Sequence, residues 1–494
     1  MNVLLLSMPD AFEHMPSIAI RMPNGALTSL AANVDSHHHV STADLVLAQD
    51  HVREVVRDLV AQVQPDVIGL SIMTFQRPTA FKIASLLRTL RPKVPIVVGG
   101  YDPSLAPEVY THAAAPVDFI VRGEGEATLR LLLRALESGG DYSTVAGLTW
   151  RDGETFRTNA ERTVTRSPGE DLRLPDRSSR LLSGYTMLGR QADVVETSRG
   201  CTFDCSFCSI IEMRGRNFHP FPIERVIADL MDARARGAQT IFLVDDNIML
   251  DVERFAALCR AIVDARLNDV RYIVQAMTSS IANHGAELAP LMRQANFRYV
   301  FLGIENVVEE DLTFLKARAK NRTRATGDNA SVEAARLVRR HGMFVVGGLI
   351  VGNPGDTPET VDANLAFARR NVDWPYIQHP MPYPGTPMSR DLQARGLIAH
   401  DRVEEYDGTT AVVTNSAMDA EEIEFRRWRA ERWMKLRHMP KAFRDNPRFV
   451  IRNAPAMFKH TFRGCTWKTF LGIESSRIAH QRYREIRAKE RIYL

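Results

Sequence analysis

Short apolar segments alternate with amphipathic stretches along the first 140 positions of the chain. The candidate strands are residues 3–7, 67–71, 96–98 and 119–121. Between the first two strands, valines and leucines recur at helical spacing over residues 52–63 and predict an amphipathic helix. Strands that alternate with helices are typical of a parallel sheet with both faces covered. The pattern therefore predicts an α/β fold, with a flavodoxin- or Rossmann-like domain over residues 1–145.

The same alternation returns in the second half of the chain. Six apolar segments there predict strands at residues 193–197, 240–244, 272–275, 299–303, 344–350 and 376–379. Six strand-helix repeats exceed a simple open sheet and fall short of a closed eight-fold barrel. We therefore expect a partial (β/α)6 barrel over residues 188–390, with its active face at the carboxyl ends of the strands.

Two further segments complete the predicted organisation. Residues 147–156 predict a hairpin turned by Asp152 and Gly153, and a Ser-, Arg- and Pro-rich passage at about residues 160–185 predicts a linker. We therefore assign residues 146–187 to a hairpin and linker. Residues 391–494 are expected to form a basic, mainly helical cap.

Composition supports an ordinary globular protein. The 494 residues are 45% apolar and 25% charged, which fits two to four domains with full-sized cores. Five cysteines are too few for a disulfide scaffold, so the protein is expected in a reducing compartment. The first residues lack the features of a signal peptide, and no apolar stretch approaches a bilayer span. These observations predict a cytoplasmic protein, and nucleic acid is not an expected partner.

The charge of the chain is unevenly distributed. The net charge is +4, yet residues 421–494 hold 19 Lys/Arg against 8 Asp/Glu. Helical spacing predicts that Phe425 and Trp428 pack inward while the arginines of that segment face water. A solvated helical cap is the favoured interpretation. The alternative is attraction to an anionic surface, which would make the protein peripheral to the inner membrane.

Three cysteines, Cys201, Cys205 and Cys208, follow a glycine directly after a predicted strand. Thiolates are the ligands of iron-sulfur clusters, and three of them would leave the fourth iron of a 4Fe-4S cluster open for an amino acid ligand. A structural zinc site is the alternative, with His219 as a distant fourth ligand. The remaining two cysteines, at positions 259 and 465, are expected to be packing residues.

The CxxxCxxC motif, with an aromatic residue before its last cysteine, resembles the radical S-adenosylmethionine (SAM) superfamily. The resemblance covers residues 190–390, and residues 1–140 resemble the cobalamin-binding domain that one branch carries ahead of the barrel. Together they span about three quarters of the chain. The resemblance implies three cofactors: a 4Fe-4S cluster, SAM and cobalamin.

The resemblance also implies roles for residues at the strand ends. The cluster would lie on the three cysteines, with Phe207 near the SAM adenine. Contacts to SAM are expected from Asp245, Asp246, Asn247, Gln275, Glu305 and Gly352. Each of these segments has a simpler interpretation as a strand-to-helix turn or helix cap.

Four prolines in the stretch 379–387 disfavour regular structure and predict a stiff loop over the active face. The resemblance places this loop at the closing end of the barrel. His379 and Tyr383 are the candidate catalytic residues, as substrate contacts, and buried loop packing is the alternative for both.

Small and polar residues end three strands of the first domain, where open parallel sheets bind ligands. The candidate cobalamin contacts are Ser71, Thr74, Gly99, Gly100, Gly123, Glu124, Gly125 and Glu126. The D-x-H-x-x-G motif that supplies a cobalt ligand in other cobalamin domains is absent, and His14 is expected to be a surface histidine. The run 37–39 consists of three histidines and could suggest a metal, but a solvated turn is favoured.

The resemblance implies an enzyme that reductively cleaves SAM and, with cobalamin, methylates an unactivated carbon of a lipid-like or natural-product substrate. Flavodoxin or ferredoxin would be the electron donor. Oxidative ring closure of the magnesium-protoporphyrin ester cyclase type is the alternative reaction. A transfer RNA methylthiotransferase is disfavoured because residues 1–200 contain no cysteine. A cobalamin sensor or scaffold is the non-enzymatic alternative. Substrate identity and oligomeric state are left open.

Overall fold

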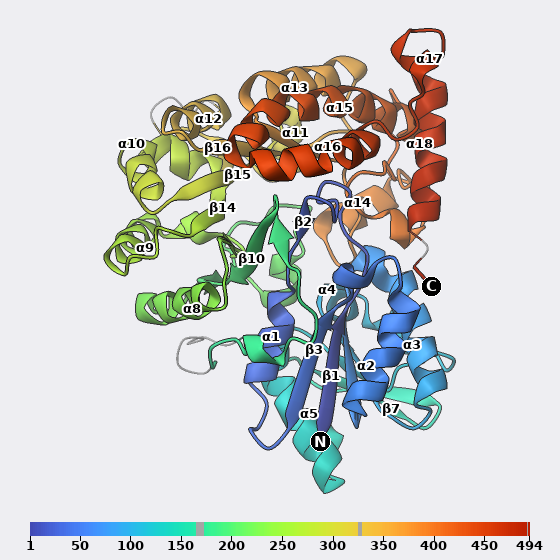
Figure 1. Ribbon diagram of the computed structural model, residues 1–494. Helices are drawn as coiled ribbons and strands as arrows, with labels where there is room; N and C mark the ends of the chain where they lie inside the picture. The colour runs from blue at the N-terminus through green and yellow to red at the C-terminus, as the bar shows by residue number, and fades with distance from the viewer. Residues whose placement is uncertain (165–171, 325–328, 492) are drawn as a thin grey trace.

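The computed structural model describes residues 1–164, 172–324, 329–491 and 493–494. Two sheets with their covering helices lie next to each other, and the C-terminal helices pack over the second sheet (Figure 1). The predicted α/β class, with a parallel sheet, a partial barrel and a helical C-terminal region, is confirmed. Among the described residues, no helix is both long enough and apolar enough to span a membrane.

The N-terminal sheet has five parallel strands followed by an antiparallel hairpin. Across the sheet the strands are β3 (His39–Asp44), β1 (Asn2–Ser7), β4 (Val67–Ser71), β5 (Ile96–Gly99), β6 (Phe119–Val121), β7 (Leu148–Asp152) and β8 (Thr155–Thr158). The order of the parallel strands is that of a flavodoxin-like sheet. All four predicted strands and the predicted hairpin are present.

Helices cover both faces of this sheet. Helices α2 (Val52–Val63) and α3 (Arg77–Leu90) bury their apolar stripes on one face. Helices α1 (Gly25–Ala32) and α5 (Gly125–Ser138) cover the other face, together with the hairpin. The short helix α4 (Tyr101–Leu105) follows β5.

The second sheet is curled and contains the six predicted parallel strands. These are β10 (Arg190–Val195), β13 (Thr240–Leu243), β14 (Arg271–Met277), β15 (Phe297–Glu305), β16 (Phe344–Ile350) and β17 (Trp374–Gln378). Its outer face is covered by α8 (Ile223–Ala235), α9 (Val252–Asp264), α10 (Thr278–Gln294), α12 (Ser331–Arg340) and α13 (Pro358–Asn371). Shorter helices α7 (Ile210–Arg214), α11 (Glu309–Phe314) and α14 (Pro387–Ala394) lie in the connections.

Two short strands extend this curled sheet beyond β10. Strand β9 (Thr186–Met187) pairs antiparallel with β10, and β2 (Ile20–Arg21) pairs with β9. Strand β2 belongs to the N-terminal part of the sequence, so the first half of the chain contributes an edge strand to the second sheet. A separate two-stranded ladder joins β11 (Ser198–Arg199) to β12 (His219–Pro220).

The C-terminal region is helical, as predicted. Its helices are α15 (Ala420–Asp445), α16 (Pro447–Thr461), α17 (Trp467–Phe470) and α18 (Ser476–Glu490). Asp419 caps α15, accepting a hydrogen bond from the backbone N–H of Glu422 at 2.7 Å. Helix α15 packs along β17 and α16 packs back against α15. The last residues, Tyr493 and Leu494, contact the core of the N-terminal sheet.

Several local predictions were wrong. Strand β3 was missed because His39–Asp44 lacks a continuous apolar run, and its side chains are buried only towards its end. The predicted solvated turn at the three histidines holds for His37, which is exposed in a turn, but His38 is buried and His39 begins the strand.

The prediction that Phe425 and Trp428 of α15 pack inward is confirmed. Part of the predicted linker, residues 165–171, lies outside the described residues.

Candidate cofactor and active site

The three cysteines lie in one loop at the carboxyl end of β10, after the short strand β11. Cys205 is buried, Cys201 and Cys208 are half-buried, and all three are free thiols. Burial is the main cause that raises the pKa of Cys205, and it raises the pKa of Cys208 to about 12. The charges of neighbouring cysteines raise both values further. Three neighbouring thiols on one loop, of which one is buried and two are half-buried, fit an iron-sulfur cluster, whose positive iron ions would stabilise the thiolates.

The segment 245–247 after β13 holds this cysteine loop in place. Asp245 accepts hydrogen bonds from the backbone N–H of Thr197 at 2.6 Å and from the Ser198 hydroxyl at 2.8 Å. Asp246 accepts from the backbone N–H of Gly200 at 2.8 Å. Burial raises the pKa of Asp245 to about 7. In this arrangement both carboxylates position the loop, and their expected contact with the SAM amino group stays a prediction.

Asn247 reaches the first cysteine directly. Its side-chain amide donates to the Sγ of Cys201 at 3.6 Å. Hydrogen bonds to the sulfur ligands are one of the ways by which proteins tune iron-sulfur clusters. The amide is therefore suitably placed to modify a cluster bound at this loop.

Glu305 ends β15 with a positive φ of 59°, and its buried carboxylate is paired with Lys320. The same ammonium lies 5.4 Å from the ring centroid of Phe207. Burial lowers the pKa of Lys320, but the charges of Glu305 and Cys205 outweigh this effect and raise it overall. Lys320 thus interacts with Cys205 of the cysteine loop, with Phe207 and with Glu305. The last two are the residues expected near the SAM adenine and in contact with SAM.

Gly352 has a positive φ of 91°, which favours glycine, and it has a close neighbour. A Cβ at this position would lie 2.4 Å from Cγ2 of Ile423 on α15. Its backbone N–H donates to Asp356 at 2.7 Å. Packing of α15 therefore accounts for this glycine, and the expected adenine contact stays a prediction.

Gln275 lies on the concave face of the curled sheet. Its neighbours Val274 and Ala276 are buried against the outer helices, whereas Gln275 is exposed. Adjacent side chains on a strand point to opposite faces, so Gln275 faces the inside of the half-barrel. The rings of Phe301 and Tyr376 also meet there, with centroids 5.2 Å apart. This concave face is the structure's candidate substrate surface.

His379 uses both ring nitrogens within the protein. Its Nδ1 lies 3.0 Å from the carbonyl oxygen of Val351, and Arg427 donates to its Nε2 at 3.1 Å. Burial, and then the charge of Arg427, lower the pKa of His379 to about 3. A neutral histidine in this position joins the end of β17 to α15. A contact to substrate would require one of these bonds to break.

Tyr383 lies in the proline-rich loop and donates to the carbonyl oxygen of Tyr406 at 3.1 Å. Burial raises its pKa. Its ring packs in an apolar cluster that also contains Phe207 and Phe75, the latter from the N-terminal domain. Tyr383 is therefore half-buried where the proline-rich loop meets the N-terminal domain, close to the expected adenine site.

A cavity of about 420 Å³ lies at the carboxyl edge of the N-terminal sheet and extends to the edge of the half-barrel at β10. Seven of the eight candidate cobalamin contacts line it: Ser71, Gly99, Gly100, Gly123, Glu124, Gly125 and Glu126. Thr74 is buried and is not among the lining residues. A Cβ on Gly100, whose φ is 101°, would lie 2.8 Å from the carbonyl oxygen of Ile72. Glycine keeps this turn close to its neighbouring strand, which fits a large ligand approaching the backbone.

Arg199 connects the cavity to the cysteine loop. It lines the cavity, lies two residues before Cys201 and donates to Glu126 at 2.8 Å. It also contacts Glu196 at 2.9 Å and Glu124 at 3.5 Å. Burial works to raise the pKa of Glu126, but the charge and hydrogen bond of Arg199 lower it to about 2. The two predicted cofactor regions thus share a buried ion pair.

His14 was expected at the surface, and this prediction was wrong. It is buried, lies 3.3 Å from Glu431 of α15 and stacks on Tyr376 at 4.3 Å between ring centroids. Among the described residues that line the 420 Å³ cavity there is no histidine. The geometry agrees with the absence of a D-x-H-x-x-G cobalt ligand from the sequence.

Family comparisons match both halves of this architecture. The model of the Radical SAM superfamily matches residues 195–368, and the model of the B12 binding domain matches residues 16–133. The chain belongs to the cobalamin-binding branch of the radical SAM superfamily. It is an enzyme whose cofactors are a 4Fe-4S cluster, SAM and cobalamin, and the zinc alternative is set aside.

Relatives of this radical SAM protein differ in the reactions that they are named for. An uncharacterized methyltransferase of Pyrococcus horikoshii is 25% identical over 86% of this chain and 90% of its own length. The anaerobic magnesium-protoporphyrin IX monomethyl ester cyclase of Synechocystis is 26% identical over 96% and 91%. The hopanoid C-3 methylase of Methylococcus capsulatus is 27% identical over 68% and 62%.

A solved structure shares the fold. It is the radical SAM methyltransferase TsrM of Kitasatospora setae with cobalamin and a 4Fe-4S cluster bound. The two proteins are 21% identical and superpose with a TM-score of 0.64, covering 80% of this chain and 75% of the other. The likeness shows that the two proteins share a fold over the superposed part of the chain.

Sequence reasoning missed three residues of the site: Lys320, Arg199 and Arg427. Lys320 lies in a polar connection after β15, and its sequence context is the same as that of a lysine that faces solvent. Arg427 was grouped with arginines expected to face water, yet it is buried against His379. Of the three residues, Arg199 could have been predicted from the sequence. It lies two residues before Cys201 and just after a predicted strand, and strand ends of this kind form the expected active face.

Proposed function

We propose that this radical SAM protein is a cobalamin-dependent C-methyltransferase acting on a lipid-like substrate. The observation that carries the proposal is the continuity of two regions: Arg199, on the cysteine loop, lines the 420 Å³ cavity and pairs with Glu126 of the glycine turn. A single ion pair therefore connects the candidate cluster site to the candidate cobalamin site. A methyl donor and a radical initiator must meet at one substrate carbon, which this layout favours.

The residues that would hold the cofactors follow from the geometry. Cys201, Cys205 and Cys208 would bind the cluster, and Asn247 would donate to the first sulfur. When bound, the cluster supplies the electron that cleaves SAM to methionine and a 5′-deoxyadenosyl radical, and cobalamin carries the methyl group. Asp245 keeps the loop in its conformation through hydrogen bonds.

An apolar substrate is supported by the concave face of the half-barrel. The aromatic rings of Phe301 and Tyr376 meet there, and Met277 lies two positions after Gln275 on the same face. These side chains offer contact area and few hydrogen-bonding groups, which suits the hydrocarbon part of a lipid. The hopanoid C-3 methylase among the relatives is in line with this substrate class.

Access to a lipid substrate would be helped by the surface of α16 and α17. Apolar side chains that are at least half exposed lie on α16, on α17 and just after it: Ile451, Phe458, Trp467, Leu471 and Ile473. Arg448 and Arg452 of α16 line a neighbouring hollow together with Arg21 and Arg190. Apolar side chains flanked by arginines match the charge and polarity of an anionic phospholipid bilayer. We assign this surface to a peripheral membrane contact of a cytoplasmic enzyme.

The reaction is tested with anaerobically prepared enzyme, a chemical reductant, cobalamin, a membrane lipid extract and SAM with a deuterated methyl group. The proposal predicts both 5′-deoxyadenosine and S-adenosylhomocysteine, and a lipid product that carries the deuterated methyl group. Oxidative cyclisation is the second candidate, because the cyclase relative aligns with 96% of the chain. It would produce 5′-deoxyadenosine without transfer of the label. Flavodoxin or ferredoxin is the proposed physiological donor in place of the reductant.

The membrane contact is tested by co-sedimentation with vesicles of phosphatidylcholine alone or with 30% phosphatidylglycerol, a composition chosen so that only charge differs. R448Q/R452Q should weaken binding to the anionic vesicles by roughly thirty-fold, because each basic group near such a surface contributes about 1 kcal/mol. R53Q/R57Q, which changes two exposed arginines of α2, should bind like the parent. Equal loss in both variants, or a stable dimer through α16, would contradict this assignment.

A further inference from the structure

A cluster of two histidines and one glutamate lies at the end of the N-terminal sheet opposite to the cofactor cavity. His37 and His38 form the turn that enters β3, and Glu137 lies in the last turn of α5. Strands β3 and β6 are parallel and α5 runs back from the end of β6, so the cluster sits at the amino edge of the sheet. It is separate from the cysteines and from the 420 Å³ cavity.

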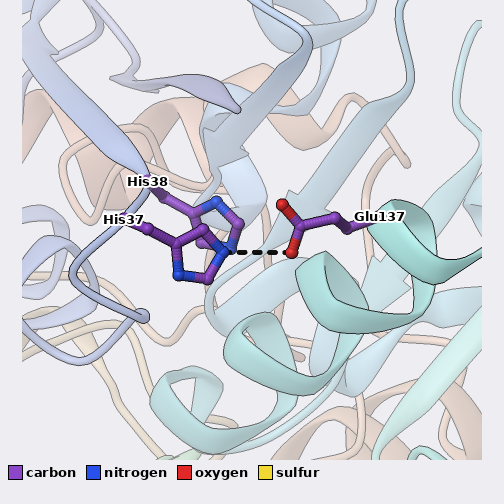
Figure 2. A group of neighbouring side chains, drawn as sticks. All are labelled: His37, His38 and Glu137. Carbon is purple, nitrogen blue, oxygen red and sulfur yellow. Dashed lines mark hydrogen bonds and ion pairs between the residues drawn. The ribbon is translucent and has the colours of Figure 1, made fainter.

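Figure 2 shows that both imidazoles approach the carboxylate of Glu137 from the same side. The Nε2 of His37 lies 3.0 Å from Oε2 of Glu137, and the two rings are 4.0 Å apart between centroids. One ligand atom from each residue lies within 4.8 Å of the other two. Bonds of about 2.0–2.1 Å in a tetrahedral zinc site place ligand atoms roughly 3.3 Å apart, so small side-chain rotations suffice.

His38 carries the strongest indication. Only 6% of the residue is exposed, and its Nε2 has no hydrogen-bond partner in the described structure. Leaving a buried polar atom unpaired costs about 1–3 kcal/mol, so such atoms need an explanation. Its other nitrogen, Nδ1, faces the amino group of Met1 at 3.4 Å. A cation between the rings and the carboxylate would give Nε2 its missing partner.

A simple surface ion pair would explain only part of this arrangement. The side chains of His37 and Glu137 are about half exposed, and such a pair contributes at most about 1 kcal/mol. It would leave unexplained why a second imidazole lies next to the first, tilted by 49°, with its buried Nε2 unpaired among the described residues. Two nitrogen ligands and one oxygen ligand are a typical zinc donor set, with a fourth position for water.

We propose that His37, His38 and Glu137 bind one Zn²⁺ ion that clips the β3 turn to the end of α5. The consequence reaches the cofactor cavity through the helix itself. Helix α5 begins at Gly125 and Glu126, both of which line the cavity, and ends at the proposed zinc site. A metal at one end would therefore fix the helix whose other end lines the candidate cobalamin cavity.

The test uses the anaerobic holoenzyme, in which the iron-sulfur cluster occupies the cysteines, stripped of loosely held metal and titrated with ZnCl₂. We expect one equivalent of bound zinc by elemental analysis after dialysis, and a melting temperature that rises on addition of zinc. H37Q and E137Q should weaken binding at least ten-fold by calorimetry and abolish the thermal shift. Both residues are half exposed, so the variants should fold.

H39Q is the matched control, because His39 is the adjacent exposed histidine outside the cluster. It should bind zinc like the parent. Cobalt(II) titration adds a spectroscopic readout, since tetrahedral nitrogen and oxygen coordination gives visible absorption that E137Q should lose. The proposal is overturned by sub-stoichiometric zinc in the parent enzyme, by unchanged binding in E137Q, or by an equal loss in H39Q.

Discussion

Arg199 and Glu126 form a buried hydrogen-bonded ion pair of 2.8 Å that connects the cysteine loop to the glycine turn of the N-terminal sheet. Neither side chain is more than one tenth exposed. The pair couples two regions that are 73 residues apart in the sequence, and it has consequences that can be measured.

R199Q should destabilise the protein by about 3–5 kcal/mol, because it leaves the carboxylate of Glu126 buried without its cation. Urea unfolding followed by circular dichroism gives the free energy of unfolding. The exposed pair of Arg234 and Asp269 supplies the comparison, and R234Q should cost less than about 1 kcal/mol. Similar losses in the two variants would show that the buried pair has no special role.

Acid should lower the free energy of unfolding because it protonates the carboxylate of Glu126. The pKa of Glu126 falls from 4.5 to about 2 on folding, so its contribution is present above pH 4.5. It is lost as the pH falls from 4.5 towards 2, and for a shift of this size it amounts to about 3 kcal/mol. Unfolding free energies measured across this window should fall less steeply in E126Q. A parallel decline in both proteins would contradict the assignment.

Alanine at Cys201, Cys205 or Cys208 should abolish cluster assembly, because each change removes one of the three thiolates proposed to bind iron. Iron and sulfide content, together with 5′-deoxyadenosine formation, should fall at least a hundred-fold. C259A is the control, since that thiol is buried in the hydrophobic core of the half-barrel. If any single variant kept the iron content of the parent enzyme, the assignment of the three cysteines as cluster ligands would be wrong.

G352A should destabilise the protein by several kcal/mol, since the new Cβ would clash with Ile423 and φ is positive. In the I423A background, G352A should cost less free energy of unfolding than it does in the parent protein. The difference between the two costs measures the clash, and the cost that remains measures the backbone strain. At Gly153, φ is also positive, but apart from its chain neighbours no atom of the described residues lies within 4 Å of where a Cβ would be. G153A should therefore cost only about 1 kcal/mol. Chemical unfolding measures all four proteins.

The sequence alone was a good guide where burial is continuous. Strands 67–71, 119–121 and 344–350 were predicted with the bounds that the structure has. Fully buried parallel strands show as unbroken apolar runs, so hydrophobicity locates them. Strand β3 starts exposed and ends buried, and β2 and β9 are two residues long, so none of them carries such a signal.

The candidate site was predictable to the extent that it lies at strand ends. The glycine turns meet around one cavity because parallel strands bring their carboxyl ends to one edge. The burial of Arg427, by contrast, depends on how α15 packs against β17, and helical spacing within one helix cannot reveal that partner. The partner of Glu305 likewise depends on the tertiary fold, because Lys320 lies in a connection without a regular pattern.

Strand β2 places Ile20 and Arg21 at the edge of the curled sheet, although the surrounding residues belong to the N-terminal part of the chain. Tyr493 and Leu494 make the reverse exchange by packing on the N-terminal core. The N-terminal domain and the half-barrel, here called the two lobes, are thus each completed by a short segment from the other part of the chain. Recombination with a related enzyme at the linker would strip each lobe of a piece supplied by the other, so a functional chimera must transfer these short terminal segments with the lobe that they complete.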